Sequence, residues 1–117
     1  MKLERSQFLK ELKGEFPELT KKINSEGGLS TFEMDVFCAF TQKKINDGEK
    51  ENVIKCFKLA ERYFINTNNS FKSVISTCFV ECLDFSNTKK NVREWAWELF
   101  PETLKEDYIN FHGKEGI

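Results

Sequence analysis

The stretch 53–85 repeats large apolar residues at helical spacing twice in succession, and this pattern constrains the fold more than any other feature. Ile54, Phe57 and Phe64 share one helix face in the first half, and Val74 and Cys78 share one in the second. The cluster of asparagine, threonine and serine at 66–70 between them is typical of a turn. The stretch therefore predicts two amphipathic helices in a hairpin, over about 49–65 and 71–83.

Apolar periodicity and turn residues extend this prediction over the whole chain. Its 117 residues contain only two prolines and six glycines, which are few turn-forming residues for a fold with many strands. Further helical segments are expected over 3–13, 17–24, 30–47, about 92–99 and 101–111. Ser30 and Glu33 match a capping box at the start of the third. The sequence predicts an all-α bundle of about five to six helices, with a HEAT-like hairpin as a candidate for its centre.

Length and charge limit the classes of protein that this chain can belong to. We expect one domain over 1–117, with 113–117 as a frayed tail. Eighteen basic and nineteen acidic residues give almost no net charge, so nonspecific binding to nucleic acid or membrane is not indicated. The N-terminus has no apolar signal region and no apolar run approaches a bilayer span, so a cytoplasmic protein is expected.

No motif of the sequence indicates catalysis, a metal or a cofactor. Cys78 and Cys82 share a helix face, but a structural zinc site needs two more ligands, and the only histidine is His112 near the tail. We expect reduced, buried thiols instead of disulfides, in keeping with a cytosolic protein. No serine or cysteine lies in a nucleophile motif. The expectation is a protein that is not an enzyme.

Glu61 and Glu81 each lie within or beside an apolar stripe, where a carboxylate needs a partner or a chemical role. Paired carboxylates can hold a metal or act as acid and base, but such sites in helical bundles add glutamate-to-histidine spacing, which is missing here. We therefore favour structural roles for both, with hydrogen bonds from Arg62, Arg93, a tryptophan N–H or a helix N-terminus.

Acidic residues recur every four positions near the C-terminus and form the candidate partner-binding surface. They are Glu94, Glu98, Glu102 and Glu106, joined by Asp107. A solvated helix face explains this spacing, and so does a surface that complements a basic partner. Trp97 lies off the stripe of Val92, Trp95, Ala96 and Leu99, so it is either an exposed anchor for a partner or part of a second buried face.

The chain resembles a small, uncharacterised family of helical bacterial proteins and, more loosely, immunity proteins encoded beside polymorphic or contact-dependent toxins. Four segments carry the resemblance: Phe32 with Asp35 and Phe37, Cys56 to Glu61, Val74 leading to Glu81–Cys82–Leu83, and Leu99–Phe100–Pro101 with Thr103. The resemblance implies a protein that binds and neutralises a cognate toxin, often a nuclease. The alternative is a helical adaptor or repeat-type module that binds another protein in an apolar groove.

Overall fold

The computed structural model describes residues 2–25, 27–28, 30–85 and 93–115, with Ser30 described in its backbone only. Helices account for most of these residues, and no strand occurs among them beyond a single bridge between Leu3 and Thr67. The elements in order are α1 (Arg5–Glu15), the 3-10 turn η1 (Pro17–Leu19), α2 (Thr20–Asn24), α3 (Ser30–Asn46), α4 (Lys50–Asn66), α5 (Asn69–Ile75), the π-helical turn η2 (Ser76–Val80), α6 (Glu94–Leu99) and α7 (Glu102–His112). The predicted all-α fold is confirmed.

Local chemistry explains where several of these helices begin and end. Pro17 occupies the first turn of η1, where a missing N–H costs nothing. Asn68 caps α5, because its side-chain oxygen accepts a hydrogen bond of 2.8 Å from the backbone N–H of Phe71. Gly113 ends α7 with a φ of 76°, a left-handed conformation that glycine adopts without a steric cost. Pro17 and the 66–70 turn are the sequence signals from which helix starts are expected here.

Two expected segments differ from the structure. The expected helix over 71–83 is α5 followed by the π-helical turn η2, and it ends at Val80. The expected helix at about 92–99 is described only as α6, from Glu94 to Leu99, because residues 86–92, which include Val92, lie outside the described residues. The α7 helix matches its prediction within one residue at each end.

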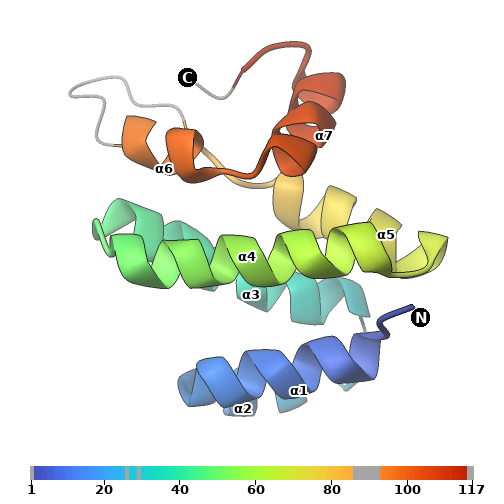
Figure 1. Ribbon diagram of the computed structural model, residues 1–117. Coiled ribbons are helices and arrows are strands. Elements are labelled where there is room, and N and C mark those ends of the chain that lie inside the picture. Colours follow the sequence, from blue (N-terminus) through green and yellow to red (C-terminus); the bar gives the residue numbers. More distant parts are fainter. Residues whose placement is uncertain (1, 26, 29, 86–92, 116–117) are drawn as a thin grey trace.

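The helices form three levels (Figure 1). α1 and α2 lie at one end of the molecule, α3 and α4 run through the middle, and α6 and α7 lie at the other end. α5 follows α4 after Thr67 and Asn68 and packs back against it, so the central hairpin expected from 53–85 is present. The η2 turn contacts both α3 and α7 and thereby links the middle level to the last one.

Aromatic side chains fill the core in two groups. At the α1 end, the buried ring of Phe8 makes edge contacts with Phe37, Tyr63 and Phe71 at centroid distances of 5.2–5.5 Å. At the α6–α7 end, Phe85 lies at the centre of a group completed by Phe57, Trp97, Phe100 and Tyr108. Each aromatic pair adds about 0.5–1.5 kcal/mol beyond the apolar area it buries. These two aromatic groups thus hold the three levels together.

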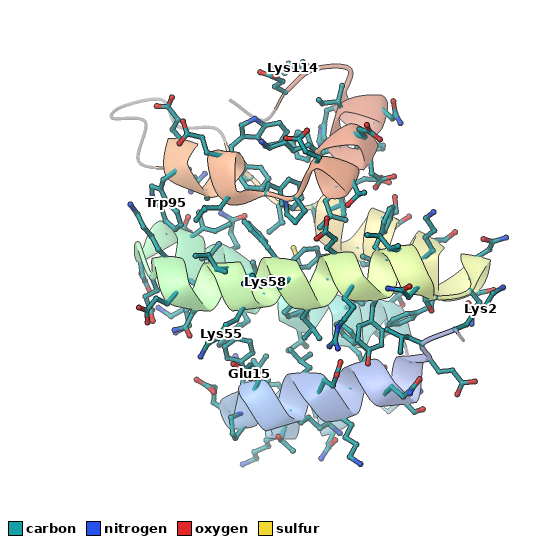
Figure 2. All side chains as sticks on the ribbon, viewed as in Figure 1. Lys2, Glu15, Lys55, Lys58, Trp95 and Lys114 are labelled. Carbon is teal, nitrogen blue, oxygen red and sulfur yellow. The ribbon has the colours of Figure 1, made fainter. Side chains whose placement is uncertain are left out.

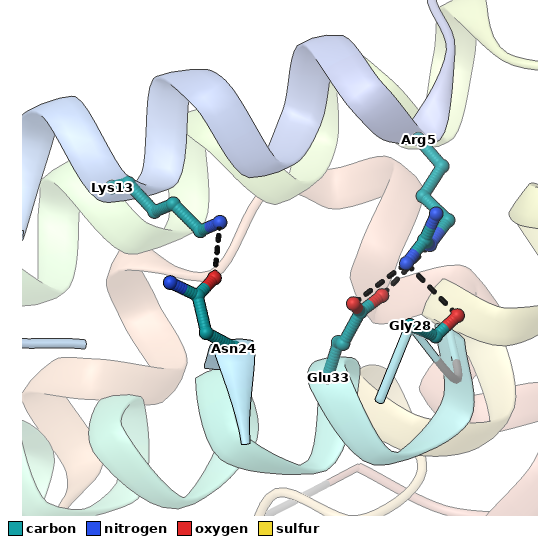
Figure 3. Close-up of polar contacts among 5 residues, drawn as sticks. All are labelled: Arg5, Lys13, Asn24, Gly28 and Glu33. Atoms are coloured by element: carbon teal, nitrogen blue, oxygen red, sulfur yellow. Dashed lines mark hydrogen bonds and ion pairs between the residues drawn. The ribbon is translucent and has the colours of Figure 1, made fainter. Parts of the chain in front are cut away.

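A buried ion pair joins α1 to the start of α3 (Figure 3). Arg5 donates from Nε to Oε1 of Glu33 at 2.7 Å and from Nη2 to Oε2 at 2.6 Å, and Nη2 also donates to the carbonyl oxygen of Gly28 at 2.9 Å. The Glu33 side chain is 5% exposed and that of Arg5 is 35% exposed. Both carboxylate oxygens of Glu33 therefore bind another helix, a role that the capping-box interpretation did not foresee. The side chain of Ser30 lies outside the described ones.

Candidate partner-binding face

The predicted acidic stripe is divided between two short helices. Phe100 has extended backbone angles and Pro101 follows it, so the helix breaks between α6 and α7. Glu94 and Glu98 share one face of α6, one turn apart, and Glu102 and Glu106 do the same on α7. All four side chains are exposed. We call these four residues the acidic face.

Among the described residues, little positive charge offsets the acidic face. Lys105 approaches Glu102 at 3.5 Å, at the long end of the hydrogen-bond range, and the Glu102 side chain remains 85% exposed. No ion pair to Glu94, Glu98 or Glu106 occurs among the described residues. Since exposed ion pairs contribute at most about 1 kcal/mol, these carboxylates do little for the fold and are free to meet a cation.

Asp107 differs from the four glutamates because it is half-buried and bonded within the protein. The Ser76 hydroxyl lies 2.6 Å from Oδ2 of Asp107 and 3.2 Å from Oε2 of Glu81. One hydroxyl has one proton to donate, so the shorter contact to Asp107 takes it. Asp107 therefore fastens α7 to the η2 turn, and we assign it a structural role in place of the expected partner-binding one.

Trp97 belongs to the core, which makes its interpretation as an exposed anchor wrong. The side chain is 4% exposed and packs against Phe85, Phe100 and Tyr108, with centroid distances of 5.2–5.9 Å. Lys105 covers the ring, its Nζ lying 5.6 Å from the centroid. The short α6 helix has to bury Ala96 and Trp97 to stay attached, and that requirement decides which way the indole points. The second buried face that the sequence allowed is the one that forms.

Glu61 and Glu81 are both half-buried and both contact a hydroxyl group. Thr103 of α7 donates to Glu61 of α4 at 2.9 Å, whereas Glu81 meets the shared hydroxyl of Ser76. Two of the expected donors have other partners: Arg62 pairs with Glu11 of α1, and Arg93 pairs with Asp84 at 2.8 Å. Glu61 thus braces α7 against α4, which is the kind of role that the apolar stripe suggested.

The cysteines lie around the η2 turn, apart from Cys56. Cys38 of α3 donates weakly to the carbonyl oxygen of Phe79 at 3.8 Å, and Cys82 donates to that of Thr77 at 3.3 Å. Carbonyl groups at a helix end lack partners within the helix, so both thiols satisfy them. Burial raises the pKa of Cys38 and of Cys56 to about 12, which keeps both thiols protonated at neutral pH. The residues with described positions contain no group of three His, Cys, Asp or Glu arranged to hold a metal ion.

Two hollows on the surface are not predicted by the sequence. One lies between α1 and α4, where Glu15 of α1 meets Lys55 of α4 at 3.2 Å. Lys58 also lies on α4 beside this hollow (Figure 2). Two ion pairs cross this hollow, since Glu11 also meets Arg62. The other lies between α2 and α3, where apolar side chains and three charged ones form the lining and the half-exposed ring of Phe32 lies at the edge. Neither involves the acidic face.

Comparison with known proteins places the chain in a family without assigning it an activity. A family model described as a domain of unknown function, DUF7674, matches residues 9–113. The chain belongs to this family. No curated protein matches the sequence and no solved structure matches the fold. In the described part of the chain, no helix has both the length and the apolar character needed to cross a membrane. The family model covers the acidic face and the central hairpin alike.

Proposed function

We propose that this protein is an immunity protein, which binds a cognate bacterial toxin in the cytoplasm and neutralises it without catalysis. The observation that carries the proposal is the acidic face, four exposed carboxylates on two adjacent helices with one weakly bound lysine among them. Many toxins of this kind are nucleases with basic surfaces that bind phosphate. An array of carboxylates complements such a surface and blocks access to it.

The burial of Trp97 changes what this face can contribute to binding. Without an aromatic anchor, the acidic face acts through charge, which speeds encounter and selects the partner more than it adds affinity. Leu99 is an exposed large apolar residue beside it, 39% accessible, and it supplies an apolar contact next to Glu98. The proposed interface is therefore polar and sensitive to salt.

Co-expression with a toxin-like protein encoded by the neighbouring gene tests this proposal. We expect the protein to restore growth of cells that produce the toxin and to co-purify with it as a stoichiometric complex. Growth inhibition that persists, together with the absence of a complex, would falsify the proposal. A toxin with a disabled catalytic residue provides the control, since it should still form the complex while having no effect on growth.

The hollow between α2 and α3, with the exposed ring of Phe32 at its edge, favours a second candidate function, that of a helical adaptor. Such a protein would bind a partner through apolar contacts at Phe32 in place of charge at the acidic face. The salt dependence separates the two functions. Binding through the acidic face weakens steeply between low and high ionic strength, whereas binding carried by apolar contacts at Phe32 changes much less.

A further inference from the structure

The α3 helix presents apolar residues on both of its sides. One side is buried against the core and carries Met34, Phe37, Cys38, Thr41 and Ile45. The other side carries Phe32, Val36, Ala39 and Phe40, of which Phe32 is 49% exposed and Ala39 is exposed. Their spacing of four, three and one residues keeps them within one broad stripe of the helix. Val36 and Phe40 are partly covered by the core, where the ring of Phe40 lies 4.7 Å from that of Phe16. Phe32 and Ala39 are therefore the exposed apolar residues of this second stripe.

The second stripe borders the hollow of about 480 Å³ between α2 and α3. Leu19 and Phe40 contribute apolar atoms to the hollow, while the charged groups on its lining are Lys22, Asp35 and Lys43. The Lys43 side chain is 71% exposed and its bond to Asp47, at 3.1 Å, is a surface pair of small energy. Lys43 is thus available to a new partner at little cost.

The charges on this stripe are arranged symmetrically about a small residue. Asp35 precedes Ala39 by four residues, and Lys43 follows it by four. At a rise of about 1.5 Å per residue, each charge lies about 6 Å along the helix from Ala39. If a second α3 crosses antiparallel at Ala39, Asp35 of each helix comes level with Lys43 of the other. The same contact then forms twice, as a two-fold axis requires.

We propose that a second copy of this chain covers the α3 stripe, so that the protein is a two-fold symmetric dimer with antiparallel α3 helices. Ala39 at the crossing lets the two backbones approach closely, because it adds only a methyl group. Phe32 and Val36 bury their exposed surface in the contact. α2 lies at the opposite end of the molecule from α6 and α7, with α3 in the middle level, so a second chain seated beside α2 leaves the acidic face open to a partner (Figure 1).

Sedimentation equilibrium with charge-reversed variants tests the dimer. Asp35→Lys and Lys43→Glu each bring like charges together twice, and we expect each to weaken dimerisation at least about tenfold. The double variant Asp35→Lys/Lys43→Glu restores opposite charges and should dimerise nearly as well as the unmodified chain. A monomer at concentrations up to about 100 μM, or a double variant as weak as the single ones, overturns the proposal.

The apolar half of the contact has its own variant and control. Phe32→Ser removes the most exposed aromatic ring of the stripe and should give a monomer. Ile65→Ser is the control, since Ile65 of α4 is 55% exposed and lies outside the stripe. Thermal melting of both variants establishes that they are folded. The proposed interface is contradicted if Phe32→Ser is folded and still dimeric, or if Ile65→Ser disrupts the dimer equally. It is also contradicted if the unmodified chain is a folded monomer that uses Phe32 only to bind a different protein.

Discussion

Glu33 is the one acidic residue of the described chain that is buried. Removing a carboxylate from water is costly, and here two short hydrogen bonds from Arg5 offset that cost. The bonds are bidentate, so they also fix the angle at which α1 meets α3. Since Arg5 remains about one-third exposed, water still screens part of the attraction. The pair acts chiefly as a specific connection between two helices.

Replacing Glu33 with glutamine should reveal how much this connection contributes. Glutamine keeps the size of the side chain but leaves Arg5 facing an amide, so we expect a loss of about 1–3 kcal/mol in the free energy of unfolding. Urea denaturation measures this loss. Asp47→Asn removes a carboxylate from the exposed pair with Lys43 and should change stability by no more than about 0.5 kcal/mol. Equal effects of the two substitutions would show that the burial of Glu33 adds nothing.

Buried ionisable groups predict how stability responds to alkali. Burial raises the pKa of the Cys38 and Cys56 thiols to about 12 and, together with a hydrogen bond to Glu11, raises that of Tyr63 to about 12. In the unfolded chain these groups have pKa values near 9 for the thiols and 10 for tyrosine. Because their pKa values are higher in the folded protein, their contribution to the free energy of unfolding is fully present below the unfolded-state values and is lost as the pH rises toward 12.

The melting temperature should therefore stay level around neutral pH and fall progressively above pH 9. Thiol labelling at pH 8 provides an independent measurement. Cys82 is exposed and should react first, whereas Cys38 and Cys56 should react only when the protein unfolds. Rapid labelling of all thiols in the folded protein would contradict the burial on which the alkaline prediction rests.

At the scale of the element, α7 is held by its aromatic side chains and by a small number of polar contacts. Tyr108 packs on Trp97 and Phe85, Thr103 donates to Glu61, and Ser76 donates to Asp107. The ring of His112 lies over Tyr108, and its Nε2 is 3.1 Å from the carbonyl oxygen of Glu81, which can only accept a hydrogen bond. These contacts place the acidic face relative to the core.

Ser76→Ala should loosen this attachment. Asp107 loses its short hydrogen bond while staying half-buried, so we expect a loss of about 0.5–1.5 kcal/mol. Ser73→Ala is a matched control, because Ser73 is exposed on the preceding helix and experiences a similar change in helix propensity. Hydrogen exchange should show faster opening of α7 in Ser76→Ala alone. Identical exchange rates in the two variants would contradict the role of Ser76 in holding α7.

Helix positions could be predicted from local signals, whereas contacts between helices could not. Pro17, Asn68 and Gly113 act on their own backbone neighbourhoods, and the expected boundaries near them agree with the structure. The η2 turn has no such signal, because an i→i+5 pattern is imposed by packing against α3 and α7. Arg5 and Glu33 are 28 residues apart, so their pairing depends on the tertiary fold.

The candidate site shows the same division. The exposure of Glu94, Glu98, Glu102 and Glu106 was expected from their spacing. The burial of Trp97 depends on how α6 rests on the core, and the sequence left both possibilities open. The apolar stripe of α3 could not be predicted from the sequence, because periodicity identifies an amphipathic helix by the contrast between its faces, and α3 has apolar residues on two of them.

At the scale of the whole molecule, charge is distributed unevenly although the total is nearly neutral. Residues 94–107 hold five acidic residues and one lysine, while residues 2–24 hold six basic and four acidic ones. α6–α7 and α1–α2 lie at opposite ends of the three levels (Figure 1). A basic partner is therefore drawn to the α6–α7 end, and the field weakens within about 10 Å at physiological salt. This asymmetry is what connects the fold to the proposed function.

The most direct test of the proposed function is the affinity for the toxin encoded by the neighbouring gene, measured by calorimetry with two matched variants. Glu98→Gln/Glu102→Gln removes two charges from the acidic face, and Glu18→Gln/Glu51→Gln removes two from exposed positions elsewhere. We predict that the first variant binds at least about tenfold more weakly at low salt, while the second binds like the unmodified protein. Equal affinities for both variants would contradict the account.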